Sequence, residues 1–332
     1  MPAEWPCVGL FDAHGEGVPS GSDPSLERIE AGGIPVEAEV RLKALSEPGA
    51  LFTSTLGVGE FALLSELNFV PLGQVLGASV HQVGWQYLPA AAQWGGEVFC
   101  ALDLLMHAWD QARRRAFDRL TEEASLLGAD AVVGVHLRRG EHDWARGAVD
   151  YVVSGTAIKW GTASGPQWPV LSDLSVQDYW KLVKAGWRPA GLVAATAVFF
   201  VSQSTRTWWR RRITVTRNQE LEEFSRGFSA ARETAVRYLR SQASAVGASG
   251  IVGVKLEHRV SRERVRVATQ VGRQRTGLSP ATLAMGGDVP TEGRDKRDGL
   301  AVTIQAVGTA IRRERQTLVT TPQATLWLGE RA

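Results

Sequence analysis

Four residues near the middle of the chain have the types and the spacing of metal ligands. His136, Glu141, His142 and Asp143 lie in the segment HLRRGEHDW, which reads as a strand that leads into a turn. Imidazole and carboxylate groups together suit zinc or a similar divalent ion. A turn that folds residues 141–143 back toward His136 would therefore form a metal site. The same segment is also typical of a polar, solvated hairpin turn, and both interpretations stay open.

A second group mixes arginine with tryptophan. The segment TRTWWRRRITVTR (205–217) is followed by further arginines in RVSRERVRVATQVGRQR (259–275). Such a mixture can bind phosphates and stack on bases, but Arg and Trp are also enriched where proteins contact one another. A solvated loop is the third reading, and we expect the protein interface. The residues concerned are Trp208, Trp209, Arg210, Arg211, Arg212, Arg262, Arg264 and Arg266.

The chain lacks the short motifs of enzymes. It contains no GxSxG, no HExxH, no phosphate-binding glycine loop and no GxGxxG between a strand and a helix. We therefore expect no catalytic residues, no cofactor and a non-enzymatic role. Its two cysteines lie outside any CxxC, its start does not resemble a signal peptide, and its longest apolar run is 12 residues. These features predict a cytoplasmic protein without a membrane partner.

The sequence contains an internal repeat. LLGADAVVGVHL (126–137) and AVGASGIVGVKL (245–256) are nearly the same. A shift of 118 residues aligns 56–75 with 174–193, a shift of 119 aligns two long alanine-striped segments, and a shift of 153 aligns SGTAI with VGTAI. Because these matches keep one order, the sequence predicts a tandem duplication with 34 extra residues before the last segment of the second copy.

Each copy predicts the same α+β unit, a small β-sheet packed against one short and one long helix. In the second copy, Ser175 and Asp178 form a capping box and Gly186 suits a helix end, so a helix is expected over about 176–185. A strand follows from Trp187 toward Val201. Small residues at i, i+4 spacing then let a long helix lie close to the sheet. These stripes are Ala112, Ala116, Leu120 and Ala124, and Ala231, Ala235, Leu239 and Ala243.

These segments carry a family resemblance. GADAVVGV after a long alanine-striped helix, closed by SGTA and preceded by PLGQVLGASVHQVGW, resembles the YbjQ-like family, whose label refers to heavy-metal binding. The resemblance covers about 51–160 and, more loosely, 170–313. It implies a fold and a tendency to form rings, commonly pentamers, but no reaction. The second copy has Lys255 at the position of His136, so the resemblance does not extend the metal ligands to both copies.

The sequence predicts four regions. Residues 1–50 form an N-terminal extension with a disordered segment and two short helices that break at Gly32-Gly33, available to dock on this chain or on a protein partner. The first unit is 51–165. The second unit is 166–316, with a basic insertion at about 260–299. A tail follows at 317–332.

The charge differs sharply between the two units. Residues 51–165 have a net charge of −4 and residues 166–316 a net charge of +12. Complementary fields of this kind favour contact between unlike surfaces. We expect a homo-oligomeric, ring-like scaffold or binding module, a pentamer in the form that the resemblance implies. The alternative is a ligand-binding protein for a divalent metal ion, or for nucleic acid or another polyanion through the basic second unit.

Overall fold

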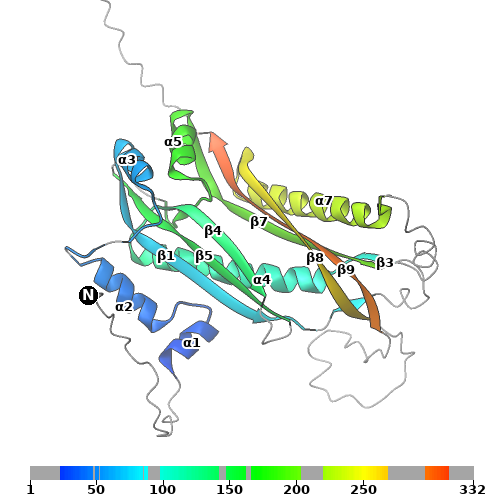
Figure 1. The fold of residues 1–332 in the computed structure, drawn as a ribbon. Coiled ribbons are helices and arrows are strands. Elements are labelled where there is room, and N and C mark those ends of the chain that lie inside the picture. The colour runs from blue at the N-terminus through cyan, green and yellow to red at the C-terminus, as the bar shows by residue number, and fades with distance from the viewer. Residues whose placement is uncertain are drawn as a thin grey trace, which may run out of the picture.

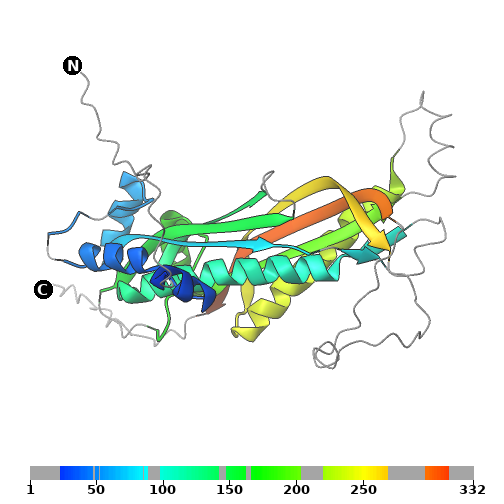
Figure 2. The ribbon, with the colours of Figure 1, turned by 90° about the horizontal axis from the view of Figure 1, so that it is seen from below.

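A computed structural model describes residues 23–47, 49–51, 53–84, 86–88, 98–141, 147–161, 166–202, 220–267 and 296–313. The fold is α+β, as predicted, and its two sheets alternate with two long helices (Figures 1 and 2). The elements are α1 (Pro24–Glu30), α2 (Val36–Leu45), α3 (Val58–Glu66), β1 (Phe69–Gln82), β2 (Tyr87–Leu88), β3 (Val98–Ala101), α4 (Asp103–Leu126), β4 (Ala131–Glu141), β5 (Ala148–Trp160), β6 (Val170–Leu171), α5 (Val176–Lys184), β7 (Trp187–Ser202), α7 (Glu222–Ala245), β8 (Gly250–Val267) and β9 (Lys296–Arg313). None of the described helices is long and apolar enough to cross a membrane.

The two sheets share one strand arrangement. The first sheet has the order β1-β5-β4-β6 and the second β2-β8-β9-β7-β3, so β1, β5 and β4 correspond to β7, β9 and β8. The irregularities in the ladders also fall at matching places. One lies between Pro71 and Gly73 in β1 and between Pro189 and Gly191 in β7. The other lies between Val133 and His136 in β4 and between Val252 and Lys255 in β8.

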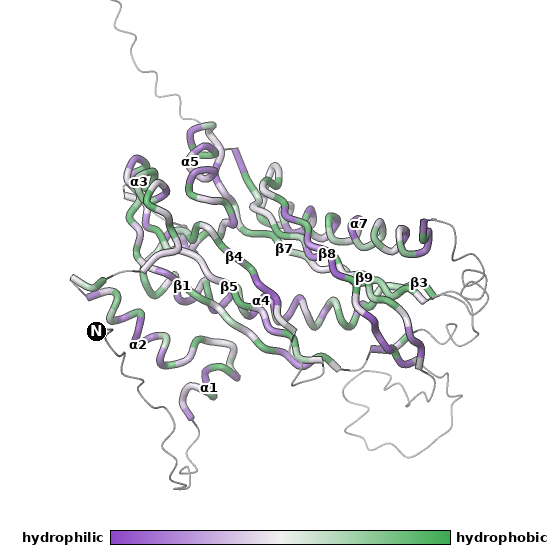
Figure 3. The backbone as a smooth tube through the Cα atoms, in the orientation of Figure 1, coloured by the Kyte–Doolittle hydropathy of each residue, from purple (hydrophilic) through white to green (hydrophobic). Residues whose placement is uncertain are grey.

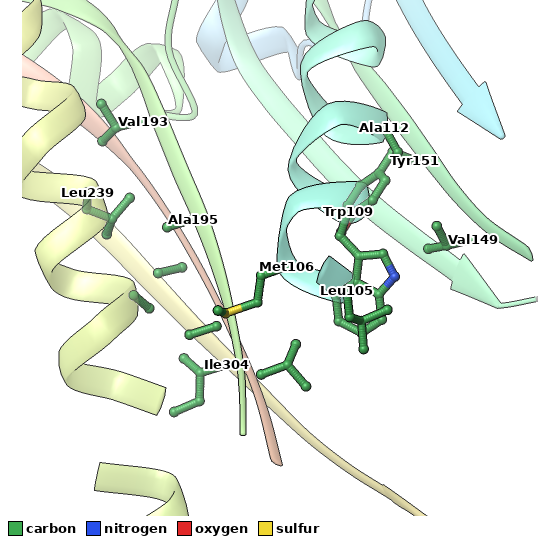
Figure 4. Close-up of a cluster of buried hydrophobic side chains, with 14 of the residues drawn as sticks. Leu105, Met106, Trp109, Ala112, Val149, Tyr151, Val193, Ala195, Leu239 and Ile304 are labelled. Atoms are coloured by element: carbon green, nitrogen blue, oxygen red, sulfur yellow. The ribbon is translucent and has the colours of Figure 1, made fainter. Parts of the chain in front are cut away.

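The two alanine stripes lie against the sheets, as the sequence predicts. All eight stripe residues are buried. Both helices alternate between apolar and polar residues along their turns (Figure 3), which is the pattern of a helix with one buried face. In the close-up of Figure 4, Leu239 of α7 faces Val193 and Ala195 on one side of β7. On the other side, α4 presents Leu105 and Met106, so a single core runs through both sheets.

The predicted helices and strands are confirmed in several places. Ser175 caps α5 by accepting a hydrogen bond from the Asp178 backbone N–H at 3.1 Å. The two short helices of the extension are α1 and α2, and residues 1–22 lie outside the described part. The predicted insertion at about 260–299 contains the end of β8, which runs on to Val267, and the start of β9 at Lys296. Its remainder lies outside the described residues, as do 314–332.

Short strands cross between the predicted units. β3 lies before α4 in the sequence but pairs with β7 in the second sheet, from Val98 with Ser202 to Ala101 with Phe199. β6 lies after the first unit's last strand but pairs with β4 in the first sheet. Each predicted unit therefore lends a strand to the other.

The N-terminal helices α1 and α2 pack on the first unit beside β1 and α4 (Figure 1). The Arg41 guanidinium lies 2.6 Å from the buried Glu123 carboxylate, whose second oxygen accepts the Leu76 backbone N–H at 2.8 Å. In the second unit the position of Glu123 is taken by Gln242, which bonds both the N–H and the carbonyl of Ala194. The first unit therefore has a carboxylate, Glu123, that pairs with Arg41 of the extension, and the second unit has the neutral amide of Gln242 at the aligned position.

Replacing Arg41 with alanine is expected to lower the free energy of unfolding by about 2 kcal/mol. It leaves the buried Glu123 carboxylate without its cation, while the partial exposure of Arg41 reduces the cost below that of a fully buried pair. In a Glu123→Gln background the same replacement should cost less than about 1 kcal/mol, because the amide can bind β1 as Gln242 does. Urea denaturation of the four proteins of this cycle measures both values. Equal costs in the two backgrounds would contradict the pairing.

Candidate assembly interface

The second unit attaches to the first through an extended segment at residues 170–174. The segment runs parallel to β4, with Val170 opposite Ala131 and Leu171 opposite Val132. Its backbone forms four hydrogen bonds of 2.9–3.0 Å to β4 and the residue before it; they join 170 to 130, 172 to 132 and 135, and 174 to 134. The same segment is anchored in its own unit, because the Asp173 backbone N–H and carboxylate both bond the Thr309 hydroxyl. Residues 170–174 therefore hold the two units together.

The helix that follows this segment inserts an aromatic ring into the first unit. Tyr179 of α5 packs edge-on against Phe69 of β1, with ring centroids 6.0 Å apart, in a buried cluster that includes Leu64 of α3. Val176, one turn earlier, is fully buried in the same cluster. Large aromatic side chains in desolvated pockets carry much of the energy of protein contacts. Tyr179 is therefore the main apolar anchor of α5.

Burial raises the pKa of the Tyr179 phenol to about 12. An unfolded tyrosine ionises near pH 10. The folded state therefore favours the neutral phenol, and this part of the stability is present below about pH 10 and is lost as the pH rises toward 12. The free energy of unfolding should fall between pH 9 and pH 11 in both proteins, and this fall should be about 1 kcal/mol smaller in Tyr179→Phe than in the parent. Urea denaturation at both values tests this, and the exposed Tyr238→Phe serves as the control. An identical loss in all three proteins would contradict it.

A buried arginine joins the same two units at another point. Arg113 of α4 is 2% exposed and donates a hydrogen bond of 2.9 Å to the Thr196 hydroxyl of β7. Its guanidinium also pairs with Asp110, one turn earlier on α4. Burial lowers the pKa of Arg113, while the Asp110 carboxylate opposes that change. The helix of the first unit therefore contacts the second sheet through a paired charge as well as through apolar residues.

Of the metal quartet, His136 is the member whose side chain lies within the described part of the structure. His136 is exposed on β4 and Glu141 ends that strand, while His142 and Asp143 lie outside the described residues. His136 shares a cavity of about 80 Å³ with Lys255, its counterpart in the second unit, whose amine lies 3.4 Å from the Asp173 carboxylate. An ammonium group beside the imidazole disfavours a cation there. Within the described ranges, no three His, Cys, Asp or Glu side chains are grouped to hold a metal ion.

The basic residues fall into two sets. Arg262, Arg264 and Arg266 lie on β8, and Arg264 forms a two-point ion pair with Asp298 of β9 at 2.6 and 3.3 Å. The Asp298 carboxylate raises the pKa of Arg264 through a hydrogen bond and its charge. Arg264 therefore ties two strands of this chain together. Trp208, Trp209 and Arg210–Arg212 lie outside the described residues.

Comparison with known proteins places this fold in a family. A family model described as "Putative heavy-metal-binding" (YbjQ) matches residues 95–161, from β3 and α4 to the end of β5. A UPF0145 protein of Halobacterium salinarum is 32% identical over 111 residues, which are 33% of this chain and 88% of that protein. The chain belongs to the UPF0145, or YbjQ-like, family. A UPF0145 protein of Psychrobacter arcticus is 43% identical over 65 residues, 20% of this chain and 37% of that protein.

One longer relative covers more of this UPF0145 chain. A protein of Mycobacterium tuberculosis named encapsulin nanocompartment protein Rv1762c is 33% identical over 220 residues, 65% of this chain and 81% of that protein. No solved structure matches the chain significantly.

Sequence reasoning missed the residues that join the two units. The alanine stripe on α4 marked the face that meets the first sheet, but Arg113 on the same helix lies against the second. The sequence does offer one indication for Tyr179, because the aligned position in the first unit is also aromatic, as Phe61. The strand at residues 170–171 is too short to be found from the sequence.

Proposed function

We propose that this UPF0145 protein is a non-enzymatic, homo-oligomeric scaffold that works in the cytoplasm, with its chains closed into a ring. The observation that carries the proposal is the outer edge of β8. Over residues 251–256 this edge has no strand beside it among the described residues, whereas β4, its counterpart, is paired with β6. Val254 and Leu256 are exposed there. Such an edge presents unpaired backbone N–H and C=O groups beside apolar side chains, and this favours pairing with a strand of another chain.

The proposal includes the tandem duplication. Equal strand order, ladder irregularities at matching residues and two buried alanine stripes support it. So does the aligned sequence. In a duplicated chain the contact between the units is head-to-tail, and repetition of such a contact closes into a ring when the rotation allows it. The resemblance to pentamers makes five chains the expected number.

The name of the M. tuberculosis relative also supports an assembly role, since that protein is called an encapsulin nanocompartment protein. By analogy, we propose that this chain acts by forming or lining a larger protein assembly. The difference of charge between the units supports contacts between unlike surfaces.

The experiment that tests this function is a mass measurement of the purified full chain. Light scattering at micromolar concentration should give a multiple of the 36.0 kDa chain mass, and negative-stain images should show closed particles. A strictly monomeric mass at that concentration would refute the scaffold. Elemental analysis of the same preparation addresses metal binding, for which we expect no stoichiometric metal. One zinc or similar ion per chain, lost in His136→Ala/His142→Ala, would favour the metal-binding alternative instead.

A further inference from the structure

The contact that joins the two units within one chain consists of a donor segment and an acceptor surface. The repeat places a second donor segment in the first unit and a second acceptor surface in the second unit. The second unit gives residues 170–184, and the first unit receives them on β4, α3 and β1. The same shift of 118 residues places 52–66 of the first unit at the position of 170–184. A shift of 119 residues places β8 at the position of β4. The first unit thus holds a donor segment and the second unit an acceptor edge, and among the described residues these two do not pair with each other.

The donor residues are exposed where their counterparts are buried. Val176 is 0% exposed and Tyr179 2% exposed, but the matching Val58 and Phe61 on α3 are 91% and 43% exposed. On the acceptor edge, Val135 of β4 is 3% exposed and the matching Val254 of β8 is 43% exposed. Burial of such apolar side chains against each other is favourable.

The donor segment is already held in place within its own unit. Thr55 bonds the Thr156 hydroxyl through both its backbone N–H, at 3.1 Å, and its own hydroxyl, at 3.0 Å. This matches the anchoring of Asp173 on Thr309, because Thr156 and Thr309 are also aligned. A segment that is fixed before it binds loses less conformational entropy on binding.

A groove on the second unit completes the acceptor surface. It has a volume of about 860 Å³ and lies between α7 and β8, where Phe228, Arg232, Leu256 and His258 are among its lining residues. The matching place in the first unit lies between α4 and β4, and β7 covers it. Arg113, which aligns with Arg232, contacts β7 there through the Thr196 hydroxyl.

The strand that matches β7 is β1, and two apolar residues on its outward face are exposed. Val80 of β1 is 60% exposed, whereas the aligned Val198 of β7 is fully buried. Leu76 on the same face of β1 is also exposed. If the step that leads from the first unit to the second is repeated beyond the second unit, the next first unit lies with its β1 over the α7 groove and its residues 53–66 against β8.

The geometry points to a second copy of this chain as the occupant of β8 and the α7 groove: its residues 53–56 pair in parallel with residues 251–254, and the outward face of its β1 covers α7. In this junction the Ser54 backbone N–H donates to the Ile251 carbonyl, and the Val254 N–H donates to the Ser54 carbonyl. Phe61 packs against Trp187, the counterpart of Phe69. This inference rests on the proposed scaffold and names the surfaces that build it.

Two variants of the full chain test the junction, each with one surface disabled. The donor variant carries Val58→Asp and Phe61→Asp, and the acceptor variant carries Val254→Asp and Leu256→Asp. All four side chains are exposed in the single chain, so each variant is expected to fold, as circular dichroism can check. The control, Leu26→Asp/Val40→Asp, alters two exposed residues of the extension, which has no counterpart in the second unit.

Light scattering should give an oligomer for the parent and for the control, and a monomer for each variant alone. A 1:1 mixture of the two variants should give a dimer that does not grow, because one intact junction remains per pair. An oligomeric parent whose donor variant keeps its full mass would overturn this junction and leave the scaffold standing. A monomeric parent would refute the scaffold itself. Self-association of a variant alone into dimers would show a symmetric contact and overturn the junction.

A cross-link gives a second readout that does not depend on loss of assembly. Leu171 pairs with Val132 in the chain, and the matching positions are Thr53 and Ile251. In a background with both native cysteines replaced by serine, Thr53→Cys/Ile251→Cys should form disulfides between chains on mild oxidation. A non-reducing gel should then show a ladder of covalent multimers that neither single-cysteine variant produces. A monomer band alone from an oligomeric sample would overturn the junction.

Discussion

Replacing Gly77 with alanine is expected to lower the free energy of unfolding by about 3 kcal/mol or more. Gly77 lies on β1 where the strand meets α4, and a methyl group there would overlap the Ala116 carbonyl and lie 2.7 Å from the Leu120 backbone nitrogen. Both are backbone atoms of a helix, so no side-chain rotation relieves the overlap. The strand and helix must separate, which opens the tightest part of the core.

The aligned residue of the second unit provides the matched control. Ala195 of β7 is buried and already carries a methyl group at this place, so β7 and α7 accommodate what β1 and α4 do not. Ala195→Gly should therefore cost only about 1 kcal/mol, from lost contacts and added chain entropy. Urea denaturation followed by circular dichroism measures both changes. A cost below about 1 kcal/mol for Gly77→Ala would contradict the close approach.

Arg113→Ala is expected to cost about 3 kcal/mol, because it removes a buried side chain and its hydrogen bond to the Thr196 hydroxyl, while Asp110 keeps Arg114 as an ion-pair partner. It also leaves a cavity between α4 and β7. The effect should appear as a lower midpoint of unfolding in denaturant.

Arg232→Ala, at the aligned position of α7, is the control. Arg232 is exposed in the single chain and lines the open groove, so its removal should change the stability of the monomer by less than about 1 kcal/mol. The comparison must therefore be made at concentrations where light scattering shows monomer, since assembly would cover Arg232. Equal losses from the two replacements would contradict the burial of Arg113 between the units.

Much of the fold follows from local rules that the sequence displays. The Ser175–Asp178 cap and the break at Gly32-Gly33 each fix an element through contacts within a few residues, and the alanine stripes mark the faces of α4 and α7 that are buried. The crossed strands were not predictable in this way. β3 and β6 have only four and two residues, and their partners are chosen by the packing of distant elements rather than by their own composition.

In the candidate site too, the sequence predicts which residues correspond, and only the fold shows which of them are buried. Alignment of the repeat made His136 and Lys255 counterparts, but only the fold shows that both line one small cavity. Alignment also paired Val58 with Val176 and Phe61 with Tyr179. It could not show that Val176 and Tyr179 are buried while Val58 and Phe61 are exposed, because exposure depends on the neighbour that a unit has.

The covalent link between the units has a consequence for how such an assembly responds to dilution. Within each chain one junction is built into a core that spans both sheets, so its strength does not depend on protein concentration. Only the junction between chains follows mass action. A ring made of whole chains holds an even number of units, and it can be opened only at every second junction. Dilution should therefore release intact two-unit chains and never single units.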